Sequence, residues 1–198
     1  FISITFLFAC CNNKQPKETT KVLQDTEFES FKNHFIDELW KASPEWASYE
    51  GLNEYDSIVL IPNEENRQKS LASIKALQTE LATFDIANLN TANETDYYLI
   101  ENKLAATLWY DNEFKSGEWN PASYGIARSV SDILNGRYDV LEVRLRSILA
   151  RLKHSNAYYA QAQQNITTPT IEHTDLAILQ SKGGLYSFGQ KLVDSVNA

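Results

Sequence analysis

A helix-turn-helix corner is predicted by the stretch Trp40-Lys41-Ala42-Ser43-Pro44-Glu45-Trp46-Ala47-Ser48-Tyr49-Glu50-Gly51-Leu52-Asn53-Glu54-Tyr55-Asp56. Pro44 lacks an N–H group and clashes with a preceding helical turn, but its fixed φ suits the first turn of a new helix. Ser43 stands where a helix cap is preferred, and Gly51 permits a backbone bend that a Cβ would resist. We therefore predict a short helix from Pro44 to Glu50, and no chemistry follows from these residues alone.

Apolar side chains recur at helical spacing on both sides of this corner, and Thr26, Asn63 and Thr91 are expected to cap three of the helices. The clearest stripe contains five apolar residues: Leu141, Leu145, Ile148, Leu149 and Leu152. No sustained alternation of apolar and polar residues indicates a strand. The fold class is therefore predicted as all-α, a multi-helix bundle with short connections. Its helices are expected at 26–40, 44–50, 63–84, 92–114, 141–152, 158–166 and from 170 onwards.

The predicted helix 92–114 has two apolar faces. Tyr97, with Ile100 and Leu104, lies on one face, whereas Tyr98 and Trp109 lie on a neighbouring face. A helix that is apolar on two sides is expected to be buried on two sides. We therefore expect this helix to be central in the bundle.

The composition is that of an ordinary globular protein, with 43% hydrophobic and 22% charged residues in a chain of 198. One helical domain is expected at this length. Eighteen basic and twenty-six acidic residues give a net charge of −8, and no run of Lys or Arg interrupts the acidity. Nucleic acid is therefore excluded as an expected partner.

The N-terminal residues resemble the end of a secretory signal. Residues 1–9 are apolar but too short to span a bilayer, which fits the end of a signal-peptide h-region. Leu7-Phe8-Ala9-Cys10 resembles a bacterial lipobox, so Cys10 is the expected lipidation site, with residues 10–24 as a polar tether and 25–198 as the helical domain. The alternative is a short buried apolar strand that ends in an ordinary cysteine.

A lipidated Cys10 predicts a protein held on a membrane of the bacterial cell envelope, facing the periplasm or the cell surface. The sequence contains no methionine, and the helical pattern continues to Ala198 without a glycine or proline stop. We therefore expect that neither Phe1 nor Ala198 is a true end of the protein.

No catalytic or metal-binding set is identified within the chain. His34 and Glu38 are four residues apart, a spacing that suits two ligands on one helix face, but no third ligand is recognisable and His154 and His173 are isolated. We therefore predict no catalytic residue, no metal ligand and no cofactor-binding residue within this chain.

Carboxylates and aromatic residues offer two further candidates. Glu50, Glu54 and Asp56 could be read as an acid/base set, although acidic loop residues are ordinary in a protein of this charge. Exposed aromatic rings can bind sugars or peptides, and Trp119 and Tyr124, in a predicted loop, are the best candidates for such a ligand site.

Four stretches along the chain carry a family resemblance. The first is the corner at 44–56, with its proline, Ala-Ser, Gly-Leu and aromatic-Asp pair. The other three are Asp96-Tyr97-Tyr98-Leu99-Ile100, Trp119-Asn120-Pro121-Ala122-Ser123-Tyr124, and Arg144-Leu145 with Arg151-Leu152. In this order the four resemble the N-terminal half of the bacterial domain of unknown function 885 family (DUF885), whose opening signature has a proline, then Ala-Ser or Ala-Thr, Gly-Leu and an aromatic-Asp pair.

The resemblance implies a secreted or lipid-anchored helical protein similar to zinc metallopeptidases, with a zinc-binding HExxH-type helix in the C-terminal half. That motif is absent from these 198 residues, so the chain is expected to help form a cleft for a peptide substrate and to be inactive alone. The alternative is a non-catalytic cell-surface lipoprotein that binds a peptide or glycan through aromatic residues. An envelope scaffold that binds only a partner protein is a third reading.

Overall fold

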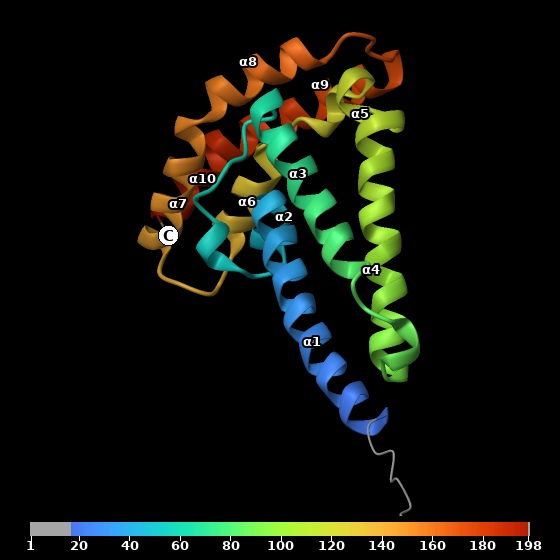
Figure 1. The fold of residues 1–198 in the computed structure, drawn as a ribbon. Helices are drawn as coiled ribbons and strands as arrows, with labels where there is room; N and C mark the ends of the chain where they lie inside the picture. The colour runs from blue at the N-terminus through green and yellow to red at the C-terminus, as the bar shows by residue number, and fades with distance from the viewer. Residues whose placement is uncertain (1–16, 198) are drawn as a thin grey trace, which may run out of the picture.

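The computed structural model describes residues 17–197, and within that range every regular element is helical (Figure 1). The all-α bundle expected from the sequence is therefore confirmed. None of the helices in this range is both long and apolar enough to cross a membrane. The longer helices are α1 Lys17–Ala42, α3 Glu64–Leu81, α4 Thr91–Trp109, α6 Ala127–Asn135, α7 Leu141–Lys153, α8 Ser155–Asn165 and α9 Ile171–Tyr186. The shorter ones are α2 Pro44–Tyr49, η1 Asn53–Tyr55, η2 Ile86–Asn88, η3 Tyr110–Phe114, α5 Ser116–Trp119, η4 Pro121–Ser123, η5 Ser187–Lys191 and α10 Leu192–Asn197.

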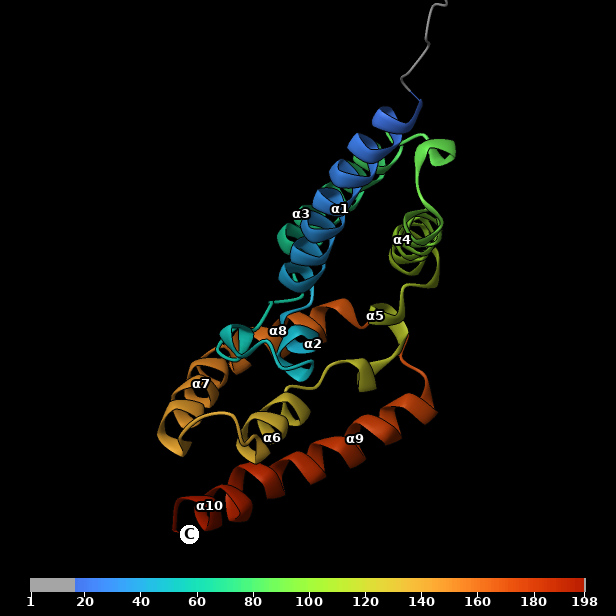
Figure 2. The ribbon, with the colours of Figure 1, turned by 90° about the horizontal axis from the view of Figure 1, so that it is seen from below.

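Each end of the molecule has its own apolar core. The long helices α1, α3 and α4 lie along one another at one end, whereas α6, α7, α9 and α10 gather at the other (Figures 1 and 2). Phe28 and Phe31 of α1 are fully buried in the first core, where Phe28 meets Phe84 edge to face at 5.0 Å between ring centroids. Ile133 of α6 and Ile148 of α7 are buried in the second core.

The corner predicted at residues 40–56 is present. α2 begins at Pro44, and Gly51 has a φ of 95°, a conformation that only glycine adopts readily. Ser43 is the N-cap residue of α2, as predicted, but its side chain makes no capping hydrogen bond. The backbone carbonyl of Ser43 instead accepts from the N–H groups of Trp46 and Ala47, so the first helical turn is already satisfied by the main chain.

Of the other predicted caps, only Asn63 is confirmed, since its side chain accepts from the N–H of Asn66 at 2.9 Å. Thr26 is not a cap, because α1 is already helical from Lys17. Thr91 is not the cap of α4 either, because Asn90, one residue earlier, accepts from a backbone N–H in the first turn. Both Asn and Thr suit this position, so the sequence pattern was ambiguous by one residue.

The expectation that the helix at 92–114 is central is wrong for the residues the structure describes. Tyr97 is buried against α1, but Tyr98 and Trp109 on the neighbouring face are each 50% exposed. Apolar periodicity identifies a face that favours burial, but it does not identify which part of the chain covers that face.

Two adjacent glycines in α9 are expected to respond oppositely to alanine. A Cβ on Gly184 would lie 2.7 Å from the Cβ of Ala127 in α6, whereas a Cβ on Gly183 meets nothing within 4 Å. Gly184→Ala should lower the free energy of unfolding by about 1–2 kcal/mol, because overpacking exceeds the gain in helix propensity. Gly183→Ala should raise it by up to about 1 kcal/mol. Urea unfolding of the two variants measures both, and shifts of the same sign would contradict the close packing of α9 on α6.

Candidate functional site

The corner at residues 40–56 is organised around a buried carboxylate, that of Asp56, which is 3% exposed. Ser48 of α2 donates its hydroxyl to Oδ1 of Asp56 at 2.5 Å, and the Tyr138 hydroxyl donates to Oδ2. Burial and this bond to Asp56 raise the pKa of Tyr138. The three side chains therefore fasten the corner to the loop between α6 and α7.

A fully buried arginine, Arg151 of α7, completes this polar corner. Its Nε donates to the backbone carbonyl of Asp56, and its Nη2 donates to that of Tyr55 at 3.1 Å. Burial lowers the pKa of Arg151, an effect opposed by the negative charges of Glu45 and Asp56. The acid/base set imagined for Glu50, Glu54 and Asp56 is not assembled: Glu50 accepts from the Trp46 indole instead, and Glu54 is exposed.

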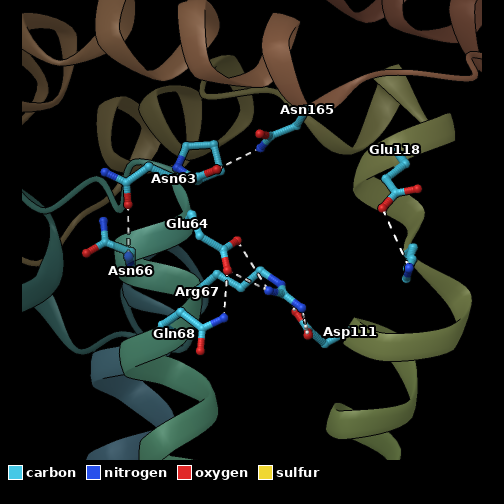
Figure 3. Close-up of polar contacts among 10 residues, drawn as sticks. Asn63, Glu64, Asn66, Arg67, Gln68, Asp111, Glu118 and Asn165 are labelled. Atoms are coloured by element: carbon cyan, nitrogen blue, oxygen red, sulfur yellow. Dashed lines mark hydrogen bonds and ion pairs between the residues drawn. The ribbon is translucent and has the colours of Figure 1, made fainter.

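The segment that leaves this corner runs into an open cleft with a volume of about 800 Å³. The wall of the cleft is formed by the segment 60–63, the first turns of α3, the η3 turn, α5 and the end of α8. Amide and charged side chains line it (Figure 3). Leu71 and Ile74 of α3 also belong to its lining and contribute apolar surface. The cleft therefore combines apolar area with many hydrogen-bonding groups, as ligand sites commonly do.

An arginine bridge crosses this cleft. Arg67 extends from α3 and donates through Nε and Nη2 to the two carboxylate oxygens of Asp111 in η3, at 3.0 and 2.8 Å (Figure 3). Its Nη1 also donates to Glu64 at 2.9 Å. Such a two-point bond is more rigid than a single ion pair, so Arg67 fixes the distance between the two sides of the cleft.

Amide side chains fix the upper wall of the cleft. Asn165 of α8 donates to the carbonyl of Pro62 at 2.7 Å (Figure 3). Asn66 donates to the carbonyl of Ile61 at 2.9 Å. These bonds hold the segment that joins the corner to α3 against α8.

The backbone at one side of the cleft is irregular. α4 continues into η3, a π-helical turn at 110–114, and Lys115 follows with a φ of 47°, in the left-handed region. Left-handed conformations of residues other than glycine cost on the order of 1 kcal/mol, and π-turns recur at functional sites. The turn places both Tyr110 and Lys115 on the cleft wall.

Aromatic rings form a continuous row from the cleft mouth to the start of α9, called here the aromatic row. Its members are Trp109, Tyr110, Phe114, Trp119 and His173, with neighbouring ring centroids 5.1–5.6 Å apart. Three of them keep large exposed areas: Trp109 at 50%, Tyr110 at 56% and Phe114 at 39%.

The two aromatic candidates from the sequence lie at different places. Trp119 belongs to the aromatic row, and its indole donates to the carbonyl of Phe114 at 2.9 Å. Tyr124 lines the cleft, where its hydroxyl donates to the carbonyl of Gly117 and accepts from Asn165. Both polar ends are thus held in place, and the rings are only partly covered.

Histidines do not combine with acidic residues into a metal site in the part of the chain described. His34 bonds to Glu80 at 3.0 Å, and His173 bonds to Thr170 at 2.7 Å. Glu38, whose spacing from His34 suits a ligand pair, accepts from Lys41 and Ser73, which lower its pKa. No group of three or more His, Cys, Asp or Glu residues suited to a metal ion occurs among residues 17–197. Cys10 lies outside the described residues.

Sequence reasoning missed the residues that bridge the cleft. Arg67 and Asp111 are 44 positions apart and lie on different elements, so no local spacing relates them. Tyr110 and Lys115 carried a weak signal, since they follow the long apolar pattern of α4 at the point where it breaks.

The fold and the site define an all-helical protein with a buried acid-arginine corner and an open, polar-rimmed cleft. The chain belongs to the family described as "Bacterial protein of unknown function (DUF885)", whose model matches residues 44–197. The resemblance stated from the sequence is therefore confirmed. No curated protein matches the chain.

The fold is shared with a solved structure described as "a putative lipoprotein of unknown function from Shewanella oneidensis". The two are 43% identical, with a TM-score of 0.82 over 86% of this chain. The match covers 31% of the Shewanella chain, so the present chain spans about a third of the length of that relative.

Proposed function

We propose that residues 1–198 are the helical front part of a longer, lipid-anchored DUF885 protein of the bacterial cell envelope, on its periplasmic side or at the cell surface. The lipobox at residues 7–10 supports the anchor, and the solved relative is described as a lipoprotein. Residues 1–9 then end the signal peptide, residues 10–24 carry the lipid and lead into the domain, and residues 25–198 form the helical region.

Replacement of Cys10 by Ser is expected to release the protein from the membrane. The lipid chains supply about 0.8 kcal/mol of membrane affinity per buried CH₂, and Ser cannot receive them. Incorporation of radiolabelled palmitate in bacteria that express the full-length protein measures the modification. Cys11→Ser is the matched control and should keep the label. Equal labelling of Cys10→Ser and the parent protein would contradict the assignment.

The function supported best for the cleft is to form one wall of a peptide-binding site. The observation that carries this proposal is the cleft itself, whose rim of amides and charges surrounds apolar area. Amide donors and acceptors match the backbone of an extended peptide, and the apolar area matches its side chains. In this proposal the Arg67–Asp111 bridge keeps the cleft open at a fixed width.

Hydrolysis of a bound peptide by zinc is the further activity that the family resemblance implies. The described residues do not fit a zinc site, since they contain no cluster of three metal-binding side chains. The proposal gives this chain binding and orientation of the peptide, with the HExxH-type helix in polypeptide outside residues 1–198.

Tyr110→Ala should weaken binding of a peptide to the full-length protein. Tyr110 lines the cleft and belongs to the aromatic row, so its loss removes an aromatic contact. Affinity for oxidised insulin B chain, measured by calorimetry, should fall roughly tenfold, or about 1.4 kcal/mol. Tyr98→Ala, a similarly exposed tyrosine on α4 outside the cleft lining, is the control. Unchanged affinity of Tyr110→Ala would count against the peptide site.

A non-catalytic glycan- or peptide-binding lipoprotein is the second candidate, and the aromatic row favours it. Partly exposed rings in a row are a surface on which sugar rings can stack. Trp119→Ala and Tyr124→Ala should then abolish the fluorescence change caused by chitohexaose. Hydrolysis of the insulin chain by the zinc-loaded full-length protein, without any response to chitohexaose, would exclude this candidate.

A further inference from the structure

Helix α9 presents its small side chains to the rest of the molecule. Ala177 and Gly184 lie on the side that faces α6 and η4, and Gly184 approaches Ala127 so closely that a Cβ would collide. Figure 2 shows α6 on this side of α9, with no other drawn helix on the opposite side. The inward side of α9 therefore buries little apolar area of its own.

Large apolar side chains of α9 lie exposed on the other side, on a surface called here the outer face of α9. Leu179 is 67% exposed, Leu185 71% and Tyr186 62%. Ile171 and Ile178 of α9 lie on the same side of the helix and are also exposed. A helix with its larger apolar residues facing outward is expected to be covered in the working protein.

We infer that the outer face of α9 is the docking surface for the part of the DUF885 polypeptide that lies outside these 198 residues. The argument from length is direct: the Shewanella relative shares this fold at 43% identity, but the match covers only 31% of its chain. A protein of that length has further polypeptide that can cover a face of this third, and the outer face of α9 is apolar, helical and exposed among residues 17–197. This inference rests on one part of the proposed function, namely that the chain belongs to a longer polypeptide.

Charges on the outer face agree with a protein occupant. Asp175 and Lys182 lie among the apolar side chains, and neither forms an ion pair with another residue that the structure describes. A second protein surface can offer opposite charges to both, whereas the acyl interior of a membrane cannot.

The position of α1 also favours a protein occupant over a membrane. The start of α1, which follows the proposed anchor in the sequence, lies at the far end of the molecule from α9 in both views (Figures 1 and 2).

Thiol labelling tests the docking surface directly. A cysteine is introduced as Leu179→Cys, in a background with Cys10→Ser and Cys11→Ser, into the 198-residue chain and into the product of the whole gene. Lys69→Cys on the exposed side of α3 is the matched control. Leu179→Cys should react with iodoacetamide as fast as the control in the 198-residue chain, but at least tenfold more slowly in the longer protein.

Equal reactivity of Leu179→Cys in the two proteins would overturn the inference, as would a gene that ends at Ala198. Sedimentation of the 198-residue chain as a dimer that Leu179→Glu dissociates, with no protection in the longer protein, would make a second copy the occupant. Leu179-dependent binding to phosphatidylcholine vesicles, again without protection, would make it a lipid surface.

Failure of the docking surface and failure of the peptide site remain distinguishable. Thiol protection at Leu179 is measured without a ligand, and Leu179 is outside the cleft lining. Protection with no effect of Tyr110→Ala on peptide affinity keeps the docking surface and removes the peptide site. The opposite pair of results keeps the peptide site alone.

Discussion

Arg151→Ala is expected to lower the free energy of unfolding by about 3–5 kcal/mol, since truncation of one member of a buried charge cluster leaves the other charge uncompensated. Arg151 is 0% exposed, and its guanidinium donates to the carbonyls of Tyr55 and Asp56. The substitution would leave both carbonyls without these donors and would open a cavity beneath the corner.

Urea unfolding followed by circular dichroism measures this loss. Arg146→Ala in the same helix is the matched control, because its side chain is 77% exposed and pairs only with Glu142, so its effect should stay within about 0.5 kcal/mol. Arg151→Lys should also be costly, because a single ammonium cannot reproduce the fork of the guanidinium. An Arg151→Ala effect as small as that of Arg146→Ala would show that the buried cluster contributes nothing to stability.

The sequence predicted the helical elements well because their information is local. The stripe in α7, the restart at Pro44 and the bend at Gly51 each depend on residues within a few positions of one another. Local rules also explain where the predictions were wrong. Asn90 and Thr91 are both residue types that cap helices well. Which of them is the cap depends on the backbone conformation between η2 and α4.

The polar corner and the cleft could not be predicted because their contacts are long-range. Arg151 and the Asp56 carbonyl it binds are 95 positions apart. An arginine at this place in the α7 pattern looks like an ordinary solvent-facing residue, since arginines are mostly exposed. The packing of α7 against the corner decides its burial, and no periodicity in either segment reports that packing.

The same limit applies to the exposed apolar faces. The sequence shows that Tyr98 and Trp109 of α4 belong to an apolar pattern, but both are 50% exposed in the part of the chain that the structure describes. Apolar periodicity therefore predicts that a helix face is buried, but it does not identify the segment that covers that face. The proposed docking surface on α9 is an inference about such a segment.

The second large effect is expected for Asp56→Ala, with a loss of about 3 kcal/mol or more in the free energy of unfolding. Its carboxylate accepts from both Ser48 and Tyr138, and its negative charge opposes the desolvation of Arg151. All three partners would lose an acceptor or a counter-charge at once. Asp37→Ala, at an exposed position of α1, should change stability by no more than about 0.5 kcal/mol.

A double-mutant cycle separates the cluster from its individual bonds. If Asp56 and Arg151 act as one unit, Asp56→Ala with Arg151→Ala should cost less than the sum of the two single losses, because each single change already removes their interaction. Asp56→Asn keeps an acceptor for one hydroxyl but removes the charge, so its loss should fall between those of Asp37→Ala and Asp56→Ala. Strict additivity in urea unfolding would mean that the corner is held by its hydrogen bonds alone, without help from the buried charges.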